Sequence, residues 1–158
     1  RECVDDQWMA YRIGQTQYLG QLLQLAGIPI VVPVGGHAVF IDAKKFLPHV
    51  PQEQYPAQAL TAALYLESGV RAMERGIASA GRDPKTGLNN VPKLELVRLT
   101  IPRRVYTQSH MDYVAEKVIA LYQKREKIHG LDIAWEPPAG SLRFFLMRHK
   151  PVGGKLID

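Results

Sequence analysis

The strongest secondary-structure signal in the chain is the apolar run at 93–101 (KLELVRLTI), which a proline ends. Leucine, valine, threonine and isoleucine in this density predict a β-strand. Arg98 lies inside the run, and in a regular strand its side chain shares a face with Leu94, Leu96 and Thr100. An unpaired buried charge is very costly, so a guanidinium at this position requires a negatively charged partner. The fold must therefore present Arg98 to a carboxylate.

The sequence leaves two interpretations of this arginine open. In the first, Arg98 forms a salt bridge inside the protein, to Glu95, Glu74 or Asp42. In the second, the planar guanidinium holds the carboxylate of a ligand through two parallel hydrogen bonds, a geometry that favours arginine over lysine. The spacing of the residues alone does not choose between them.

The flanking pattern mixes helices and strands without strict alternation. Apolar periodicity predicts a helix that Gly27 ends, a second from Pro56 to a stop at Gly69, and a third that begins with a capping box of Ser109 and Asp112. The expected strands are those at 28–32, 37–43, 70–74, 93–101, 131–136 and 142–148. This order predicts an α/β (α+β) fold in which a mainly antiparallel or mixed sheet is covered by helices.

Composition excludes several classes of protein. The length of 158 residues and the 46% of hydrophobic residues suit one folded domain with a sizeable core. The net charge of +5 is spread over short groups such as Lys44-Lys45 and Arg103-Arg104, without a polybasic tract, so we expect no nucleic-acid partner. No apolar stretch reaches the roughly 20 residues of a membrane span. The single cysteine, Cys3, permits no internal disulfide.

Common catalytic and binding motifs are missing from the chain. Gly35-Gly36 precedes His37, but neither phosphate-binding glycine motif is present. No cluster of His, Cys, Asp and Glu has metal-ligand spacing, so we expect no metal site. No Ser or Cys stands in a nucleophile elbow. Taken alone, Arg75 is a solvated or ion-paired arginine.

Several long segments, in a fixed order, resemble the tyrosine phenol-lyase and tryptophanase family of β-eliminating lyases. The resemblance covers about 18–148, nearly the whole chain. Its segments are PVGGHAVFIDAKKFLPH, QYPAQAL, YLESGVRAMERG, LVRLTIPRRVYT, HMD and LRFF. The resemblance implies the fold of type I pyridoxal-phosphate enzymes, which have a large cofactor domain and a small domain. We then expect 1–27 to lead from the large domain, 28–149 to be the small domain, and 150–158 to be a loose tail.

The resemblance also assigns roles to residues. Arg98 matches the arginine that binds the α-carboxylate of the substrate. Phe144 and Phe145 match aromatic residues that close over the substrate ring, and Met73 matches a residue that lines the ring pocket. Arg75, in the motif MERG, matches the arginine that contacts the phenolic oxygen in tyrosine phenol-lyases. Well-known tryptophanases carry an apolar residue in place of Arg75 and a histidine in place of Phe144.

The implied reaction is an α,β-elimination that converts L-tyrosine into phenol, pyruvate and ammonia. The alternatives are a tryptophanase, which releases indole from L-tryptophan, and a non-catalytic interaction module that retains the small-domain fold. The motif MERG does not decide between the two enzymes. Assays of phenol and indole release by the full-length protein would distinguish a tyrosine phenol-lyase from a tryptophanase.

The resemblance implies pyridoxal 5′-phosphate and K⁺ as cofactors of the full-length enzyme, a cytoplasmic homotetramer. The lysine that binds the cofactor covalently lies upstream in the family, and neither Lys44 nor Lys45 replaces it. We therefore expect this segment alone to bind no cofactor and to be inactive. Its expected partners are the aromatic amino acid, the large domain of the same protein and further copies of the chain.

Overall fold

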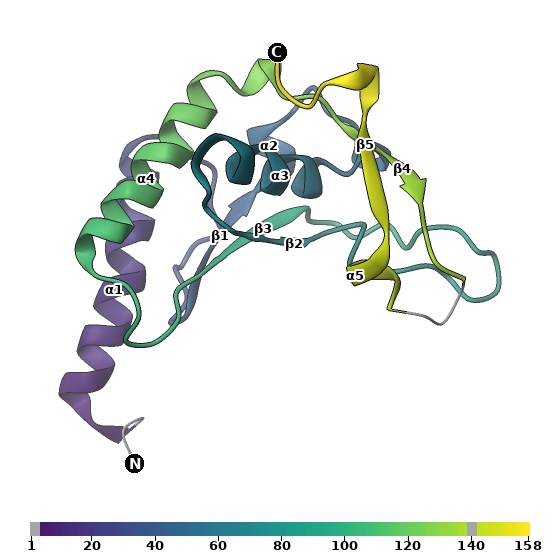
Figure 1. Cartoon of the computed structure of the whole chain (residues 1–158). Coiled ribbons are helices and arrows are strands. Elements are labelled where there is room, and N and C mark those ends of the chain that lie inside the picture. The colour runs from purple at the N-terminus through teal and green to yellow at the C-terminus, as the bar shows by residue number, and fades with distance from the viewer. Residues whose placement is uncertain (1–3, 139–141) are drawn as a thin grey trace.

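The computed structural model describes residues 4–138 and 142–158, and in these residues two small antiparallel sheets are packed with helices (Figure 1). The main elements, in chain order, are α1 (Asp6–Leu25), β1 (Ala38–Asp42), α2 (Ala43–Phe46), α3 (Pro56–Ser68), β2 (Met73–Arg75), β3 (Leu96–Thr100), α4 (Gln108–Gln123), β4 (Leu131–Trp135), α5 (Arg143–Leu146) and β5 (Arg148–Pro151). Short 3₁₀ turns lie at Gln52–Gln54, Arg125–Lys127 and Val152–Gly154. The predicted α/β fold with antiparallel sheets covered by helices is confirmed.

The strand predicted from 93–101 is β3, and it is the central strand of the larger sheet. The strand order is β1-β3-β2, with both pairings antiparallel. Val97 and Leu99 alternate along β3 with half-buried neighbours, and they are buried on one face of the sheet together with Val39 and Ile41 of β1. Helix α3 packs against β2 and β3. One face of this sheet therefore belongs to the core, and the other is more open.

Helix α3 begins and ends at the residues that the sequence predicts. Pro56 is its first residue, where a missing amide hydrogen costs nothing. Gly69 ends it in a left-handed conformation (φ 71°), and its amide donates to the carbonyl of Tyr65. Because the helix stops there, the chain turns directly into β2, which carries the motif MERG.

Helices α1 and α4 lie side by side (Figure 1). The predicted capping box of α4 was wrong, because the helix begins earlier. Thr107 is the N-cap, and its amide donates to Nδ1 of His110, which completes the box. Asp112 instead accepts a hydrogen bond of 2.5 Å from the hydroxyl of Tyr18, so it ties α4 to α1.

The strand predicted at 28–32 was wrong. Only Ile30 pairs there, in an isolated bridge to Ile41. Pro29 and Pro33 have no amide hydrogen to donate, which limits this segment to a few bonds at the edge of β1.

The end of the chain also differs from the prediction. Residues 143–146 form the short helix α5 instead of a strand, and the amide of Met147 donates to the carbonyl of Arg143. A short apolar run fits either structure, and here the backbone closes into a helical turn. The expected loose tail is wrong too, because β5 pairs with β4 and the buried Leu156 accepts from the amide of His129.

In the part of the chain that the structure describes, no helix combines the length and the apolar character that a membrane crossing requires.

Candidate functional site

Arg98 lies at the middle of β3 on the open face of the sheet. It is directly opposite Phe40 of β1 and Met73 of β2, so these three side chains form a row across the strands. Nη2 of Arg98 lies 2.9 Å from the sulfur of Met73, a weak acceptor, and Nε is buried without a hydrogen-bond partner. Within residues 4–138 and 142–158, Arg98 forms no ion pair. Its charge is uncompensated.

Two of the acids that the sequence offered as partners are buried on the opposite face of the sheet. The Glu74 carboxylate accepts hydrogen bonds from the amides of Ala78 (3.1 Å) and Ser79 (3.0 Å). Oε1 of Glu95 accepts from the amide of Ile77 at 2.7 Å. Burial raises the pKa of both carboxyl groups. Strand alternation therefore separates these acids from Arg98.

The third acid, Asp42, is on the same face of the sheet but is used locally. Its Oδ1 accepts from the amide of Lys45 at 3.2 Å and caps α2, and its Oδ2 lies 3.5 Å from the Lys45 ammonium. None of the three expected internal partners compensates Arg98. The geometry consequently favours the interpretation in which the guanidinium receives a carboxylate from outside the described chain.

Arg75 is on the same face as Arg98. In the sheet register it is opposite Leu96, as Met73 is opposite Arg98, and side chains two residues apart on a strand point the same way. Arg75 is exposed at the end of the edge strand β2. The structure thus brings together three residues that the sequence singled out: Met73, Arg75 and Arg98.

Gly76 completes this motif for a steric reason. A Cβ at position 76 would overlap the carboxylate of Glu95, which is fully buried. The same carboxylate holds the amide of Ile77 and the side chain of Gln52. The strand end that carries Arg75 is therefore fixed by a buried acid that only glycine can approach this closely.

We expect Gly76→Ala to destabilise the chain by about 1–3 kcal/mol, the usual cost of overpacking a close contact. Urea unfolding followed by circular dichroism measures the change. Gly14→Ala is the matched control, because a Cβ at this helical position meets no other atom within 4 Å, and it is expected to be neutral or stabilising. Equal stabilities for wild type and Gly76→Ala would contradict the packing argument.

Phe144 and Phe145 lie in α5 and contact each other edge to face, with ring centroids 5.1 Å apart. Phe144 packs against the core, whereas the side chain of Phe145 is 70% exposed. Among the described residues, no hydrogen bond or ring contact joins either of them to Arg98. Their predicted role at the substrate ring stays a prediction.

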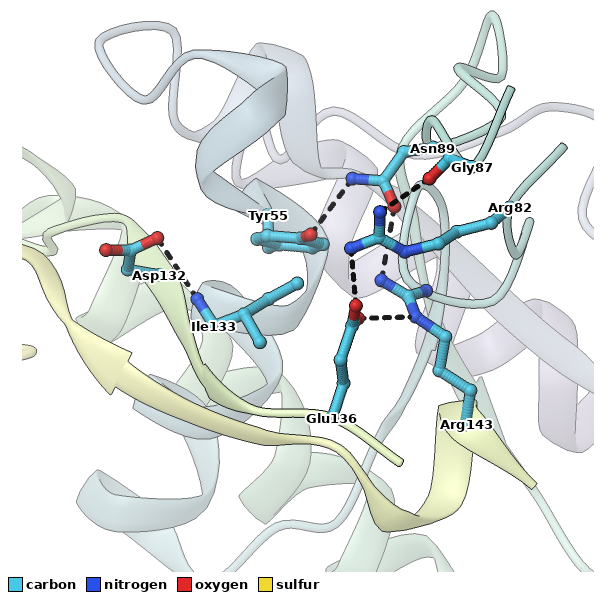
Figure 2. Close-up of polar contacts among 8 residues, drawn as sticks. All are labelled: Tyr55, Arg82, Gly87, Asn89, Asp132, Ile133, Glu136 and Arg143. Atoms are coloured by element: carbon cyan, nitrogen blue, oxygen red, sulfur yellow. Dashed lines mark hydrogen bonds and ion pairs between the residues drawn. The ribbon is translucent and has the colours of Figure 1, made fainter. Parts of the chain in front are cut away.

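A polar network fixes α5 to the loop at 81–90 (Figure 2). Arg143, the first residue of α5, donates from Nε to Glu136 at 2.8 Å and from Nη2 to Asn89 at 3.1 Å. Arg82 pairs with the same Glu136 at 2.7 Å. Asn89 in turn donates to the hydroxyl of Tyr55, just before α3. This network sets the position of the segment that carries Phe144 and Phe145.

Glu136 is the shared acceptor of this network. Burial alone would raise its pKa, but the hydrogen bonds from Arg143 and Arg82 outweigh burial and hold the pKa below its ordinary value. No local sequence pattern predicts this network, because its charged residues are far apart in the chain. Only folding brings 82, 89, 136 and 143 together.

We expect Glu136→Gln to destabilise the chain by about 1–3 kcal/mol, since Arg143 is largely buried and loses its counter-ion. Because the folded pKa of Glu136 is lowered, the ionised acid stabilises the fold at neutral pH, and this stabilisation disappears as the pH falls through that pKa. Urea unfolding at several pH values should therefore show wild type and variant converging in acid. The control Glu67→Gln, which removes the surface pair with Lys124, should change stability by less than about 1 kcal/mol.

The family model described as "Beta-eliminating lyase" matches residues 3–117, which is most of the chain. The chain belongs to the β-eliminating lyase family. Similar proteins include the tyrosine phenol-lyase of Symbiobacterium thermophilum, 64% identical over 151 residues, and that of Pasteurella multocida, 61% identical over 150 residues. The tyrosine phenol-lyase of Nostoc punctiforme is 60% identical over 147 residues.

These matches cover 96%, 95% and 93% of this chain but 32%, 32% and 31% of the respective relatives. The chain thus spans about a third of the length of the curated relatives it matches. Sequence similarity within the β-eliminating lyase family is therefore spread over nearly the whole chain.

The described residues do not fit a covalently bound pyridoxal phosphate. Nζ of Lys44 donates to the carbonyl of Lys93, and Nζ of Lys45 pairs with Asp42. No lysine in residues 4–138 and 142–158 has a buried, unpartnered ammonium. In the same residues no group of three or more His, Cys, Asp or Glu side chains is arranged to hold a metal ion.

Proposed function

We propose that this chain is the substrate-carboxylate-binding part of a pyridoxal-phosphate-dependent lyase that converts L-tyrosine into phenol, pyruvate and ammonia. The observation that carries the proposal is the uncompensated guanidinium of Arg98, presented by a central strand on the open face of the sheet. An arginine fork in this state requires a carboxylate, and an amino-acid substrate supplies one. The tyrosine phenol-lyase relatives supply the substrate class.

In this proposal each site residue of the chain has a separate role in the reaction. Arg98 binds and orients the α-carboxylate, which fixes the Cα–H bond for removal of its proton. Arg75 donates a hydrogen bond to the phenolic oxygen of the leaving ring, where it stabilises the charge that develops as the Cβ–ring bond breaks. The ring carbon gains a proton, and phenol leaves. Met73 lines the ring pocket, and Phe144 and Phe145 close over it and exclude water.

The remaining parts of the enzyme come from outside this chain. We propose that a large domain of the same protein supplies the lysine and phosphate contacts for pyridoxal phosphate, which withdraws electrons from Cα when bound. The K⁺ requirement, the homo-oligomeric assembly and the cytoplasmic location belong to the same proposal. The 158-residue chain alone is then inactive.

The proposal is tested by assaying the longer protein that contains this chain with L-tyrosine and with L-tryptophan in separate reactions. We expect phenol and pyruvate in equal amounts from L-tyrosine, with kcat/KM at least tenfold higher than for release of indole from L-tryptophan. A preference for indole would make the protein a tryptophanase. Release of neither product would overturn the proposal of a lyase and favour the non-catalytic module.

A further inference from the structure

A second arginine, Arg12, is more deeply buried than Arg98 and is also without a counter-ion. It lies on α1 and is 8% exposed. Among the described residues its guanidinium makes one long hydrogen bond, 3.5 Å from Nη2 to the carbonyl of His37, and Nη1 is buried without a partner. It forms no ion pair with the residues that the structure describes. A buried cation left in this state destabilises a fold unless an anion reaches it.

Arg12 lines an open cleft of about 700 Å³ between α1 and the end of β3. Trp8 contributes an aromatic wall, and His37 and Arg103 contribute further nitrogen groups at the rim. No Asp or Glu among the described residues lines the cleft. Two acids of the described chain precede Trp8 in the sequence, and neither lines the cleft: Asp5 accepts from the Trp8 amide and caps α1, and Asp6 is in the first turn of the helix.

None of the five residues assigned to the proposed substrate site lines the cleft, although Thr100, which does, is on the same face of β3 as Arg98. Arg98 is not among its lining residues, and the sulfur of Met73 contacts the Arg98 guanidinium. The two sites use different arginines from different elements. The presence of a ligand at one therefore does not follow from the other, and the inference does not depend on the proposed lyase function.

We propose that this cleft binds a carboxylate with an apolar body. The Arg12 guanidinium receives the carboxylate in a charge-assisted hydrogen bond, Arg103 adds positive charge, and the Trp8 ring covers the apolar part. The carboxylate has two possible sources: a free small acid, or an acidic side chain from the part of a longer protein that this chain lacks. Both have the same chemistry at Arg12.

The test uses 3-phenylpropionate as probe and its neutral amide, 3-phenylpropionamide, as the matched control. The chain has two tryptophans, so Trp135→Phe leaves Trp8 as the sole fluorescence reporter in the cleft. We expect a saturable change of Trp8 fluorescence with the acid and none with the amide. In this background Arg12→Met should weaken binding of the acid at least about tenfold, the loss of one charge-assisted contact.

Two further variants keep the test decisive if Arg12→Met does not fold. Arg103→Gln changes an exposed residue at the rim and should weaken binding about threefold by removing charge. Arg71→Met changes an exposed arginine that does not line the cleft and should leave binding within about twofold. Absence of binding to the wild type, binding of acid and amide alike, or loss with Arg71→Met but not with Arg103→Gln would overturn the proposal.

The same titration in the longer protein distinguishes the two sources. Binding of the probe there, with the same sensitivity to Arg103→Gln, identifies the cleft as a site for a free acid. Binding by the 158-residue chain alone, lost in the longer protein, identifies an acidic side chain of that protein as the occupant.

Discussion

Replacing Arg98 by lysine in the longer protein is expected to lower kcat/KM for L-tyrosine about 10²–10³-fold, which corresponds to roughly 3–4 kcal/mol. The reason is geometric. Arg98 is fixed at the centre of a three-stranded sheet, with a strand on each side. A planar guanidinium held there can donate hydrogen bonds to both oxygens of an α-carboxylate. The lysine ammonium is a point charge on a shorter side chain and cannot reproduce this pair of bonds.

Steady-state kinetics with L-tyrosine measures this loss, and Arg71→Lys supplies the control. Arg71 is exposed and precedes β2, so the same chemical change there should alter kcat/KM by less than about twofold. Because Nη2 of Arg98 donates to a thioether, which is a weak acceptor, Arg98→Lys should leave the unfolding midpoint in urea nearly unchanged. An Arg98→Lys variant with full kcat/KM would remove the carboxylate-binding role from this residue.

The face of the strand on which Arg98 lies could be predicted from local sequence. Alternation along β3 was sufficient to place Arg98 with Leu96 and Thr100 on one face, and burial in the structure agrees. The sequence could not decide whether an internal acid pairs with it. That answer depends on the β1-β3-β2 register, which puts Glu74 and Glu95 on the opposite face of the sheet.

The two errors of prediction at the end of the chain have a common physical origin. Residues 143–146 are too few for a period to distinguish helix from strand, and the segment 150–158 was expected to be a loose tail. Contacts with residues distant in the chain fix both segments. Arg143 of α5 donates to Asn89, and in the tail β5 pairs with β4 and Ile157 with Ile128. Contacts between segments this far apart leave no trace in a window of local sequence.

Packing in the structure accounts for most residues of the MERG motif at 73–76. Met73 contacts the arginine of the central strand, and Glu74 anchors the turn that follows β2. Gly76 leaves room for the Glu95 carboxylate. Three of its four positions therefore have contacts within this fold that account for them. Arg75 is exposed on the open face and has no such contact among the described residues, which leaves its side chain free for the role proposed for it.

Replacing Arg75 by isoleucine in the longer protein is expected to lower kcat/KM for L-tyrosine at least about 10²-fold, because the leaving phenol loses a charged hydrogen-bond donor. The fold should tolerate the change, since isoleucine suits an exposed position on the edge strand β2. β-Chloro-L-alanine is the matched substrate control. Its chloride leaves without a phenolic oxygen to stabilise, so its kcat/KM should stay within about threefold of wild type.

The comparison of the two substrates separates the possible roles of Arg75. A loss confined to L-tyrosine assigns Arg75 to the leaving group, because every earlier step is shared by both substrates. An equal loss with both substrates would instead place Arg75 among residues that shape the whole site, and the hydrogen bond to the phenolic oxygen would have to be abandoned. The same measurement on Arg98→Lys should give the opposite pattern, a loss with both substrates, since both carry the α-carboxylate that Arg98 is proposed to bind.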